Sequence, residues 1–376
     1  MALGRAAPGR PSAERRRRRK LACRARVSGT DPIRLSVVVV TYNSRDAVAG
    51  ALPALVAQLG AGDELIVVDN ASSDGTIDVV ASVAPDALVV ANAHNDGFSG
   101  GANLGARRAS GDLLLFLNPD ARPAPGFADA IRTPLRERRG WAAWMAFVTA
   151  DRGRLVNTNG GVVHFTGIAW AGEAGAESPG TLRGPREVAF VSGACMAVPR
   201  ATWEALGGFA DYFMYHEDVE WSLRARLAGG RLGIEPTAVV DHDYSFAKGQ
   251  AKWRHLERNR WATILRTYPG PLLALLAPAL AATEAALALV AARGGWGRSK
   301  AAAGSDTLRT LPGLLRSRRA VQRGRTITSA DFARWLTPDL ESEYLGRVAS
   351  HGPLRVALRA YWAAVCAALR IGARTE

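Results

Sequence analysis

Polar side chains follow three apolar stretches, each about as long as one β-strand. Asp120 ends the stretch at 113–120, Asp69 ends the one at 65–69, and Thr41 ends the one at 35–41. In open α/β sheets, ligands bind beyond the carboxyl ends of the strands. One acid after one strand would be an ordinary turn. Three polar strand ends at one edge of a sheet predict a nucleotide or metal site.

The elements that would position these groups alternate along residues 34–120. Apolar stretches predict strands at 35–41, 64–68, 87–91 and 112–117, and helical periodicity predicts helices at 46–59, 75–83 and 101–109. Strands separated by helices of this size favour βαβ units. We therefore predict an α/β fold with a mostly parallel central sheet.

Residues 95–105 form a segment rich in glycine and asparagine after the third predicted strand. The segment lacks the G-x-G-x-x-G spacing of dinucleotide-binding proteins, and the chain has no Gly-Lys-Ser/Thr of a P-loop. These absences argue against a dehydrogenase and against a P-loop NTPase. The glycines favour a helix that starts close beneath a ligand.

Several motifs with related spacing stand in order along the chain. They are Thr41-Tyr-Asn43, Asp69-Asn-x-Ser-x-Asp-Gly-Thr76, the segment 95–105, Leu117-Asn-Pro-Asp120, Val191-Ser-Gly-Ala-Cys195, Gly207-Gly-Phe209 and Tyr215-His-Glu-Asp218. Together, over about residues 34–268, they resemble a family 2 glycosyltransferase of the GT-A fold, and more closely its rhamnosyltransferase-like branch. The resemblance implies an enzyme that moves a sugar from a nucleotide-sugar to an acceptor hydroxyl with inversion.

The resemblance also implies roles for individual residues. Asp218 becomes the base that deprotonates the acceptor, with Glu217 as its neighbour or an acceptor contact. At a helix N-terminus the macrodipole should keep such a carboxylate ionised; taken alone, both could be ordinary first-turn acids. The acceptor side would hold Ser192, Gly193 and Ala194. The donor would contact Thr41, Tyr42, Asn43, Asp69, Asn70, Asn95, Gly97, Asn103, Asn118 and Asp120.

A divalent cation, Mg²⁺ or Mn²⁺, would bind the donor diphosphate in such a site. The family's usual metal motif is Asp-x-Asp, but its first position here is Asn118, which leaves Asp120. We expect His242 as a second ligand, although a strand-end histidine bonded to a neighbour is the alternative. Asp241 and Asp243 flank it and compete for this role.

Other polar and aromatic residues have simpler interpretations. Glu220 and Arg224 have i, i+4 spacing, which predicts a pair on a helix surface. Trp203 and Trp221 could stack on sugars but fit a core equally well. Residues 140–190 predict a variable segment over the acceptor cleft, and the sequence assigns no role to any residue within it.

The chain has 376 residues, 48% of them hydrophobic, and a net charge of +14. We predict a disordered basic tail at 1–32 without a secretory signal, with an address signal or binding arm as the alternative. A catalytic domain should follow at 33–268, and a helical basic and apolar region at 269–376. The three cysteines of the chain lack the spacing of metal ligands or of a disulfide framework, which fits a reducing compartment. A basic excess implies an anionic partner.

The C-terminal region suggests contact with a membrane. Residues 271–292 could lie in the membrane plane, span a bilayer, or form a soluble core helix. The basic, tryptophan-containing stretch at 252–261 and the arginines at 316–325 suit a lipid headgroup layer. A helix at 353–372 is amphipathic, with packing against neighbours as the competing explanation.

The sequence thus predicts a cytoplasmic glycosyltransferase, peripheral to the inner face of the plasma membrane. It would move L-rhamnose from dTDP-rhamnose to a lipid-linked or cell-envelope glycan, with a polyprenyl-diphosphate-linked acceptor. The first alternative is a UDP-sugar such as UDP-galactofuranose. Another is a catalytically silent transferase-like scaffold. No nucleic-acid motif appears, so we expect no nucleic-acid partner.

Overall fold

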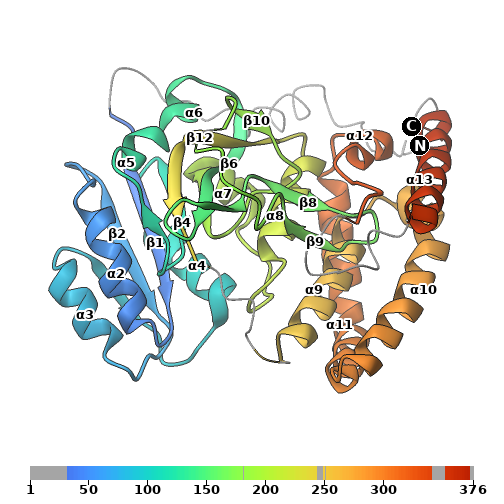
Figure 1. Ribbon diagram of the computed structural model, residues 1–376, viewed down its shortest axis with the longest axis horizontal. Helices are drawn as coiled ribbons and strands as arrows, with labels where there is room; N and C mark the ends of the chain where they lie inside the picture. Colours follow the sequence, from blue (N-terminus) through green and yellow to red (C-terminus); the bar gives the residue numbers. More distant parts are fainter. Residues whose placement is uncertain (1–31, 181, 244–248, 250, 341–351, 373–376) are drawn as a thin grey trace, which may run out of the picture.

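The structure is a computed structural model that describes residues 32–180, 182–243, 249, 251–340 and 352–372. The predicted basic tail lies, apart from residue 32, outside the described residues. A central sheet occupies the N-terminal two-thirds of the chain, and long helices form the C-terminal third (Figure 1).

Ten strands of the described chain form the central sheet, and two more form a small hairpin. The path of the large sheet is β10-β12-β6-β11-β4-β1-β2-β3, with β5 paired to β12 and β7 to β6. The strands are β1 (Leu35–Thr41), β2 (Glu64–Asp69), β3 (Leu88–Ala91), β4 (Leu113–Leu117), β5 (Arg122–Pro123), β6 (Trp141–Ala150), β7 (Leu155–Thr158), β8 (Gly161–Val163), β9 (Ala169–Ala171), β10 (Arg186–Glu187), β11 (Cys195–Pro199) and β12 (Arg231–Asp241).

The helices of the catalytic part lie between and beside these strands. α4 packs on β1 and β2, α8 on β12, and α7 on β11. The helices up to residue 227 are α2 (Arg45–Val56), α3 (Thr76–Val83), α4 (Gly97–Arg108), α5 (Phe127–Ala130), α6 (Thr133–Arg136), α7 (Arg200–Leu206) and α8 (Glu217–Leu227). Those that follow are α9 (Ala251–Thr267), α10 (Gly270–Arg293), α11 (Gly297–Arg323), α12 (Ser329–Ala333) and α13 (Gly352–Gly372).

The predicted sheet is confirmed in its first half and needs correction in its second. Strands β3, β2, β1 and β4 are parallel, and Thr41 lies beside Asp69 in the register, so these two polar strand ends meet at one edge. β11, however, runs antiparallel between β4 and β6, which makes the sheet mixed. The segment 95–105 also differs, because α4 already begins at Gly97.

Two large hydrophobic cores and one small cluster form among the described residues. The first surrounds the central sheet. The second joins Val219, Leu223 and Leu227 of α8 to apolar side chains of the C-terminal helices, including Ile264, Leu276 and Trp362. The predicted boundary at 268/269 falls between α9 and α10. Because the second core crosses this boundary, the C-terminal helices pack directly on the catalytic part.

Burial decides one open alternative and corrects two predictions about exposed side chains. Trp203 and Trp221 are core residues, stacked on each other with ring centroids 5.9 Å apart. Glu220 is fully buried, so its pair with Arg224 is not on a helix surface. Arg260, within the stretch assigned to a headgroup layer, is also buried. Its charge is neutralised by Glu257 and Glu284.

Candidate active site

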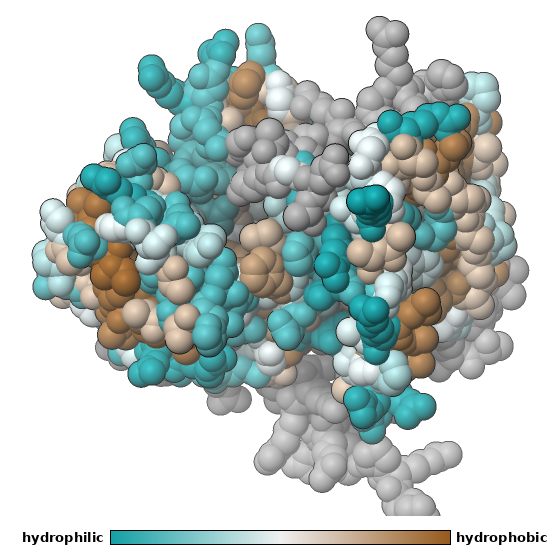
Figure 2. All heavy atoms as spheres, turned by 90° about the horizontal axis from the view of Figure 1, so that it is seen from below, coloured by the Kyte–Doolittle hydropathy of each residue, from teal (hydrophilic) through white to brown (hydrophobic). Residues whose placement is uncertain are grey.

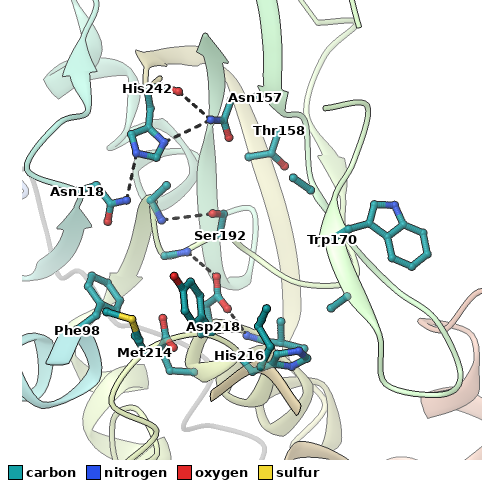
Figure 3. A pocket seen from close by; sticks show the side chains of 18 of the residues that line it. Phe98, Asn118, Asn157, Thr158, Trp170, Ser192, Met214, His216, Asp218 and His242 are labelled. Atoms are coloured by element: carbon teal, nitrogen blue, oxygen red, sulfur yellow. Dashed lines mark hydrogen bonds between the residues drawn. The ribbon is translucent and has the colours of Figure 1, made fainter. Parts of the chain in front are cut away.

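One cavity of about 1070 Å³ opens at the carboxyl ends of the parallel strands. Thr41, Asn70 and Asn118 enter it from the ends of β1, β2 and β4, and Asp218 enters from the first turn of α8. Figure 3 shows His242 and its neighbours at one end of the site and Asp218 at the other. The arrangement places polar groups from distant parts of the chain around one space.

The cavity is lined by nearly all of the residues predicted for the site. They are Thr41, Tyr42, Asn43, Asn70, Asn95, Gly97, Asn118, Asp120, Ser192, Gly193, Ala194, Glu217, Asp218 and His242. The structure therefore brings together side chains that the sequence could relate only through motifs.

Asp69 and Asn103 are absent from the cavity lining, and both support neighbouring backbone instead. The carboxylate of Asp69 is buried and accepts hydrogen bonds from the hydroxyls of Thr41 and Ser72. The amide of Asn103 exchanges two hydrogen bonds with the backbone of Phe209. Each residue supports a cavity wall in this position, and its direct contact with the donor stays a prediction.

His242 and Asp120 form a close pair at one end of the cavity. His242 Nε2 lies 3.0 Å from Asp120 Oδ1. The amides of Asn118 and Asn157 flank the imidazole ring, with their nitrogens 3.3 Å from Nε2 and 3.4 Å from Nδ1 (Figure 3). Asn157 Nδ2 also donates to the carbonyl oxygen of His242 at 2.8 Å. The ring is thus held with Nε2 toward the carboxylate.

The acids on either side of His242 point elsewhere. Asp241 accepts hydrogen bonds from the hydroxyl of Thr149 and the N–H of Gly153, and Asp243 accepts from the N–H of Asp151. Neither lines the cavity. Along a strand end, successive side chains alternate in direction, so His242 faces the cavity and its neighbours do not.

A divalent cation fits this pair in part. Within the described ranges, no group of three or more His, Cys, Asp or Glu side chains is arranged to hold a metal ion. One carboxylate oxygen and one imidazole nitrogen close together can still supply two ligands. Mg²⁺ commonly takes one or two protein carboxylates and fills its other positions with phosphate oxygens and water. The donor set therefore suits a cation that binds together with a diphosphate.

Asp218 and Glu217 lie at the other end of the site. Asp218 Oδ2 accepts the N–H of Gly193 at 2.9 Å, and Oδ1 accepts the N–H of Val219 at 2.7 Å. Glu217 Oε2 is buried and has no hydrogen-bond partner among the residues that the structure describes. The two acids therefore differ: one is oriented by backbone donors, and the other holds an unsatisfied oxygen beside the cavity.

Burial raises the pKa of both carboxyls. It lifts the pKa of Glu217 well above its usual 4.5, and repulsion from Asp218 adds to this. It also raises the pKa of Asp218 above 3.8, although the hydrogen bonds from Gly193 and Val219 oppose the shift. The expected stabilisation of the ionised form by the helix dipole is thus outweighed by desolvation. A raised pKa makes a carboxylate a stronger proton acceptor.

The buried Glu217 predicts a pH-dependent stability. A folded pKa above the unfolded one favours folding in acid, and this contribution is lost as pH rises from about 4.5 through the folded pKa. Glu217→Gln should therefore stabilise the protein at neutral pH, by about 1.4 kcal/mol for each pH unit between the unfolded pKa and either the folded pKa or the measuring pH, whichever is lower. Urea unfolding across the pH range measures it. A variant no more stable than the wild type at neutral pH would contradict the prediction.

The structure adds residues that sequence reasoning left unassigned. Asn157 and Trp170 line the cavity from β7 and β9, within the segment predicted to cover the acceptor cleft. Trp253, Leu256, Leu287, Val290 and Trp296 line it from α9, α10 and the turn before α11. For the residues of α9 the sequence did contain a signal. Trp253, Leu256 and Arg260 are three and four residues apart, which places them on one face of a helix.

Comparison with known proteins agrees with the fold. Residues 36–201 match Glycosyl transferase family 2. Residues 36–201 thus carry a glycosyltransferase domain similar to that family, and the chain has the GT-A fold. The matched segment contains Thr41, Asp120 and Gly193, whereas Asp218 and His242 follow it.

Two curated relatives are rhamnosyltransferases. The chain is 26% identical over 254 residues to the N-acetylglucosaminyl-diphospho-decaprenol L-rhamnosyltransferase of Mycobacterium tuberculosis, covering 61% of this chain and 83% of that protein. It is 23% identical over 231 residues to an O-antigen chain rhamnosyltransferase of Salmonella typhimurium, covering 60% and 71%. The similarity thus extends beyond the family domain into the segment that carries Asp218.

Among solved structures, the chain is similar to GalNAc-T7 crystallised with UDP, GalNAc and Mn²⁺. The TM-score is 0.54 at 15% identity, and the match covers 66% of this chain but only 51% of that one. At this identity the likeness concerns the fold alone.

Proposed function

We propose that this protein is an inverting rhamnosyltransferase that transfers L-rhamnose from dTDP-rhamnose to a lipid-linked glycan precursor of the cell envelope. The observation that carries the proposal is the continuity of one cavity. It runs from the Asp120–His242 pair, past Asp218, to apolar side chains of the C-terminal helices. The rhamnosyltransferases among the relatives support the choice of sugar.

In this proposal the donor occupies the end of the cavity near the parallel strands. Thr41, Tyr42 and Asn43 form the wall for the nucleoside, and Tyr42 offers a half-exposed ring on which a base can stack. Asp120 and His242 face the diphosphate. A divalent cation held there would neutralise the charge of the departing nucleoside diphosphate.

Asp218 serves as the base. Its carboxylate accepts the proton of the acceptor hydroxyl, which attacks the sugar from the face opposite the leaving group and so inverts the anomeric carbon. The N–H groups of Gly193 and Val219 hold the carboxylate in one orientation. Proximity and orientation of this kind lower the barrier because the entropy cost is met on binding.

The acceptor side of the cavity is partly apolar. Trp253 and Trp296 stack with ring centroids 4.9 Å apart, and Leu287 and Val290 of α10 continue the same wall. Such a surface suits the hydrocarbon next to a diphosphate better than a second polar sugar. It supports a polyprenyl-diphosphate-linked acceptor, the class named for the mycobacterial relative.

A membrane-facing surface would present such an acceptor. Among the described helices, α10 is long and apolar enough to cross a membrane by length and composition, with a mean hydropathy of 2.0. Only 11% of its most apolar window is buried. Figure 2 shows apolar side chains gathered along the right-hand side, where α10 and α13 lie in Figure 1. We propose a cytoplasmic protein bound peripherally to the inner face of the plasma membrane.

Thermal stabilisation by nucleotide-sugars tests the donor assignment. dTDP-rhamnose with Mg²⁺ or Mn²⁺ should raise the melting temperature, since a ligand at a hundredfold its Kd adds about 2.7 kcal/mol of stability. Asp120→Ala should lose the metal-dependent part of this shift. A response to UDP-sugars alone would move the donor to UDP-galactofuranose or a similar compound. No response to any nucleotide-sugar would instead favour the silent scaffold.

Binding to lipid vesicles tests the membrane surface. Leu289 on α10 and Val356 on α13 are 54% and 67% exposed. The double variant Leu289→Gln/Val356→Gln should bind vesicles containing phosphatidylglycerol about tenfold to a hundredfold more weakly, since two exposed apolar side chains no longer leave water. Ile77→Gln on α3, at the opposite end of the molecule, is the control. Equal flotation of all three proteins would refute the assignment.

A further inference from the structure

A buried asparagine, Asn259 of α9, binds the backbone that leads into the acid pair. The two N–H groups of its Nδ2 are shared among the carbonyl oxygens of Tyr212, Met214 and Tyr215, at 3.1, 2.9 and 2.8 Å. Its Oδ1 accepts the Nε–H of Arg258 at 2.8 Å. Because a guanidinium only donates, the amide can face the three carbonyls only with its NH₂ group. The contact is therefore specific for an amide in this orientation.

The bound segment has an unfavourable backbone. Phe213, Tyr215 and His216 have φ angles of 64°, 68° and 66°, in the left-handed region that residues with large side chains avoid. Such conformations persist only where surrounding contacts impose them, and they gather at functional sites. Glu217 follows at once as the first residue of α8. The strained segment thus sets the direction in which the two acids leave the loop.

The opposite side of the segment is held by α4. The N–H of Ser99 donates to the carbonyl oxygen of Phe213 at 3.1 Å, and the N–H of Tyr212 donates to the Ser99 hydroxyl at 3.3 Å. A Cβ atom at Gly97 would lie 2.2 Å from the Phe213 oxygen, so glycine is needed for this approach. Residues 212–216 are therefore held by hydrogen bonds both from α4 and from Asn259 of α9.

We propose that Asn259 is a positioning residue for sugar transfer: its amide holds residues 212–216 in the conformation that directs Glu217 and Asp218 into the cavity. Asn259 itself is fully buried and does not line the cavity, so it acts through this segment. The inference rests on the proposed function in so far as Asp218 is the base.

Kinetics of two variants test the role. Asn259→Ala removes the amide, and Asn259→Asp keeps its size and the acceptor for Arg258. Both should lower kcat about tenfold to a hundredfold, because a displaced base costs that much, while KM for the donor stays unchanged. Gln322→Ala is the matched control: its amide donates to the carbonyls of Arg266 and Thr267 at the end of α9, away from the cavity. It should keep the wild-type kcat.

Rescue by glycine separates positioning from general stability. Phe213 does not line the cavity, and glycine adopts a positive φ without strain. Phe213→Gly in the Asn259→Ala background should therefore recover part of the lost kcat, since the segment then needs less support. A kcat loss without any rescue would show that Asn259 does not act through this backbone.

A measurement without substrate distinguishes failure of the inference from failure of the proposed function. Loosening the segment should expose Glu217 to water and bring its folded pKa closer to its unfolded pKa. In the Asn259→Ala background, Glu217→Gln should therefore change the pH dependence of the free energy of unfolding less than it does in the wild type. The other ionisable groups around this end of the site are the same in all of the variants compared. They are Asp218, His216, Arg260 and Glu257. If the wild type transfers no sugar, the proposed function fails, and this measurement alone then tests whether Asn259 holds the segment. Unchanged pH dependence with unchanged kcat overturns the proposal.

Discussion

Asp218→Asn should reduce kcat for sugar transfer by about a hundredfold to ten-thousandfold, the range for loss of a general base. The amide oxygen of the variant can still accept the N–H of Gly193, so the first turn of α8 should stay in place. The Asp120–His242 pair, proposed to face the donor diphosphate, lies at the other end of the site from Asp218, so stabilisation by nucleotide-sugar should persist. Initial rates and thermal shifts on the same preparation measure the two effects separately.

Asp243→Asn is the matched control for this variant. It makes the same change in charge next to His242, but its side chain accepts a backbone hydrogen bond outside the cavity. It should retain nearly the full rate. An Asp218→Asn enzyme with more than a tenth of the wild-type kcat would exclude this residue as the base and direct attention to Glu217.

Glu220→Gln should lower the free energy of unfolding by about 3–5 kcal/mol, the usual cost of breaking a buried ion pair from one side. Glu220 Oε1 lies 2.9 Å from Nε of Arg266, and Oε2 lies 3.0 Å from Nη2 of Arg224. Both arginines are largely buried, so neither can recover its hydration when the anion is removed. Urea unfolding at neutral pH should show the loss.

The pH dependence of this effect has a defined sign. Burial alone would raise the pKa of Glu220, but attraction to Arg224 and Arg266 outweighs it and lowers the pKa below 4.5. The stabilisation is therefore complete above that value and disappears as pH falls through the folded pKa. Wild type and variant should converge in acid.

An exposed pair with the same spacing provides the control. Arg200 and Glu204 on α7 are also four residues apart, but their side chains are 37% and 62% exposed. Glu204→Gln should change stability by less than about 1 kcal/mol. Equal effects of the two variants would contradict the role of burial.

The contrast between these two pairs shows where sequence reasoning stops. Spacing on a helix predicts that Glu220 and Arg224 meet, and they do. It cannot predict that α9 later brings Arg266 against the same carboxylate, because that contact depends on tertiary packing. The same limit applies to Arg260, whose partner Glu284 lies 24 residues further along the chain.

The parallel strands and their polar ends were predictable because buried strands form continuous apolar runs and end in turns. The position of β11 was not, since an antiparallel strand within such a sheet has the same composition as its neighbours. The motifs predicted that Asp218 and Asp120 belong to one site, and both residues line the same cavity. Asp69 and Asn103 belong to the same motifs, but their hydrogen bonds to Thr41 and Phe209 depend on exact side-chain direction.

The second hydrophobic core has a consequence for synthesis on the ribosome. α8 carries Asp218, and its apolar face belongs to a core that also contains residues as distant as Leu369. The sheet can form once its own strands have emerged, but α8 packs on α9 and α11, which follow it in the chain, and the core that they share is complete only when α13 is made. We therefore expect a nascent chain to acquire donor-binding strands early and a properly held base last. A truncated or unfinished chain would then present a nucleotide site without the means to use it.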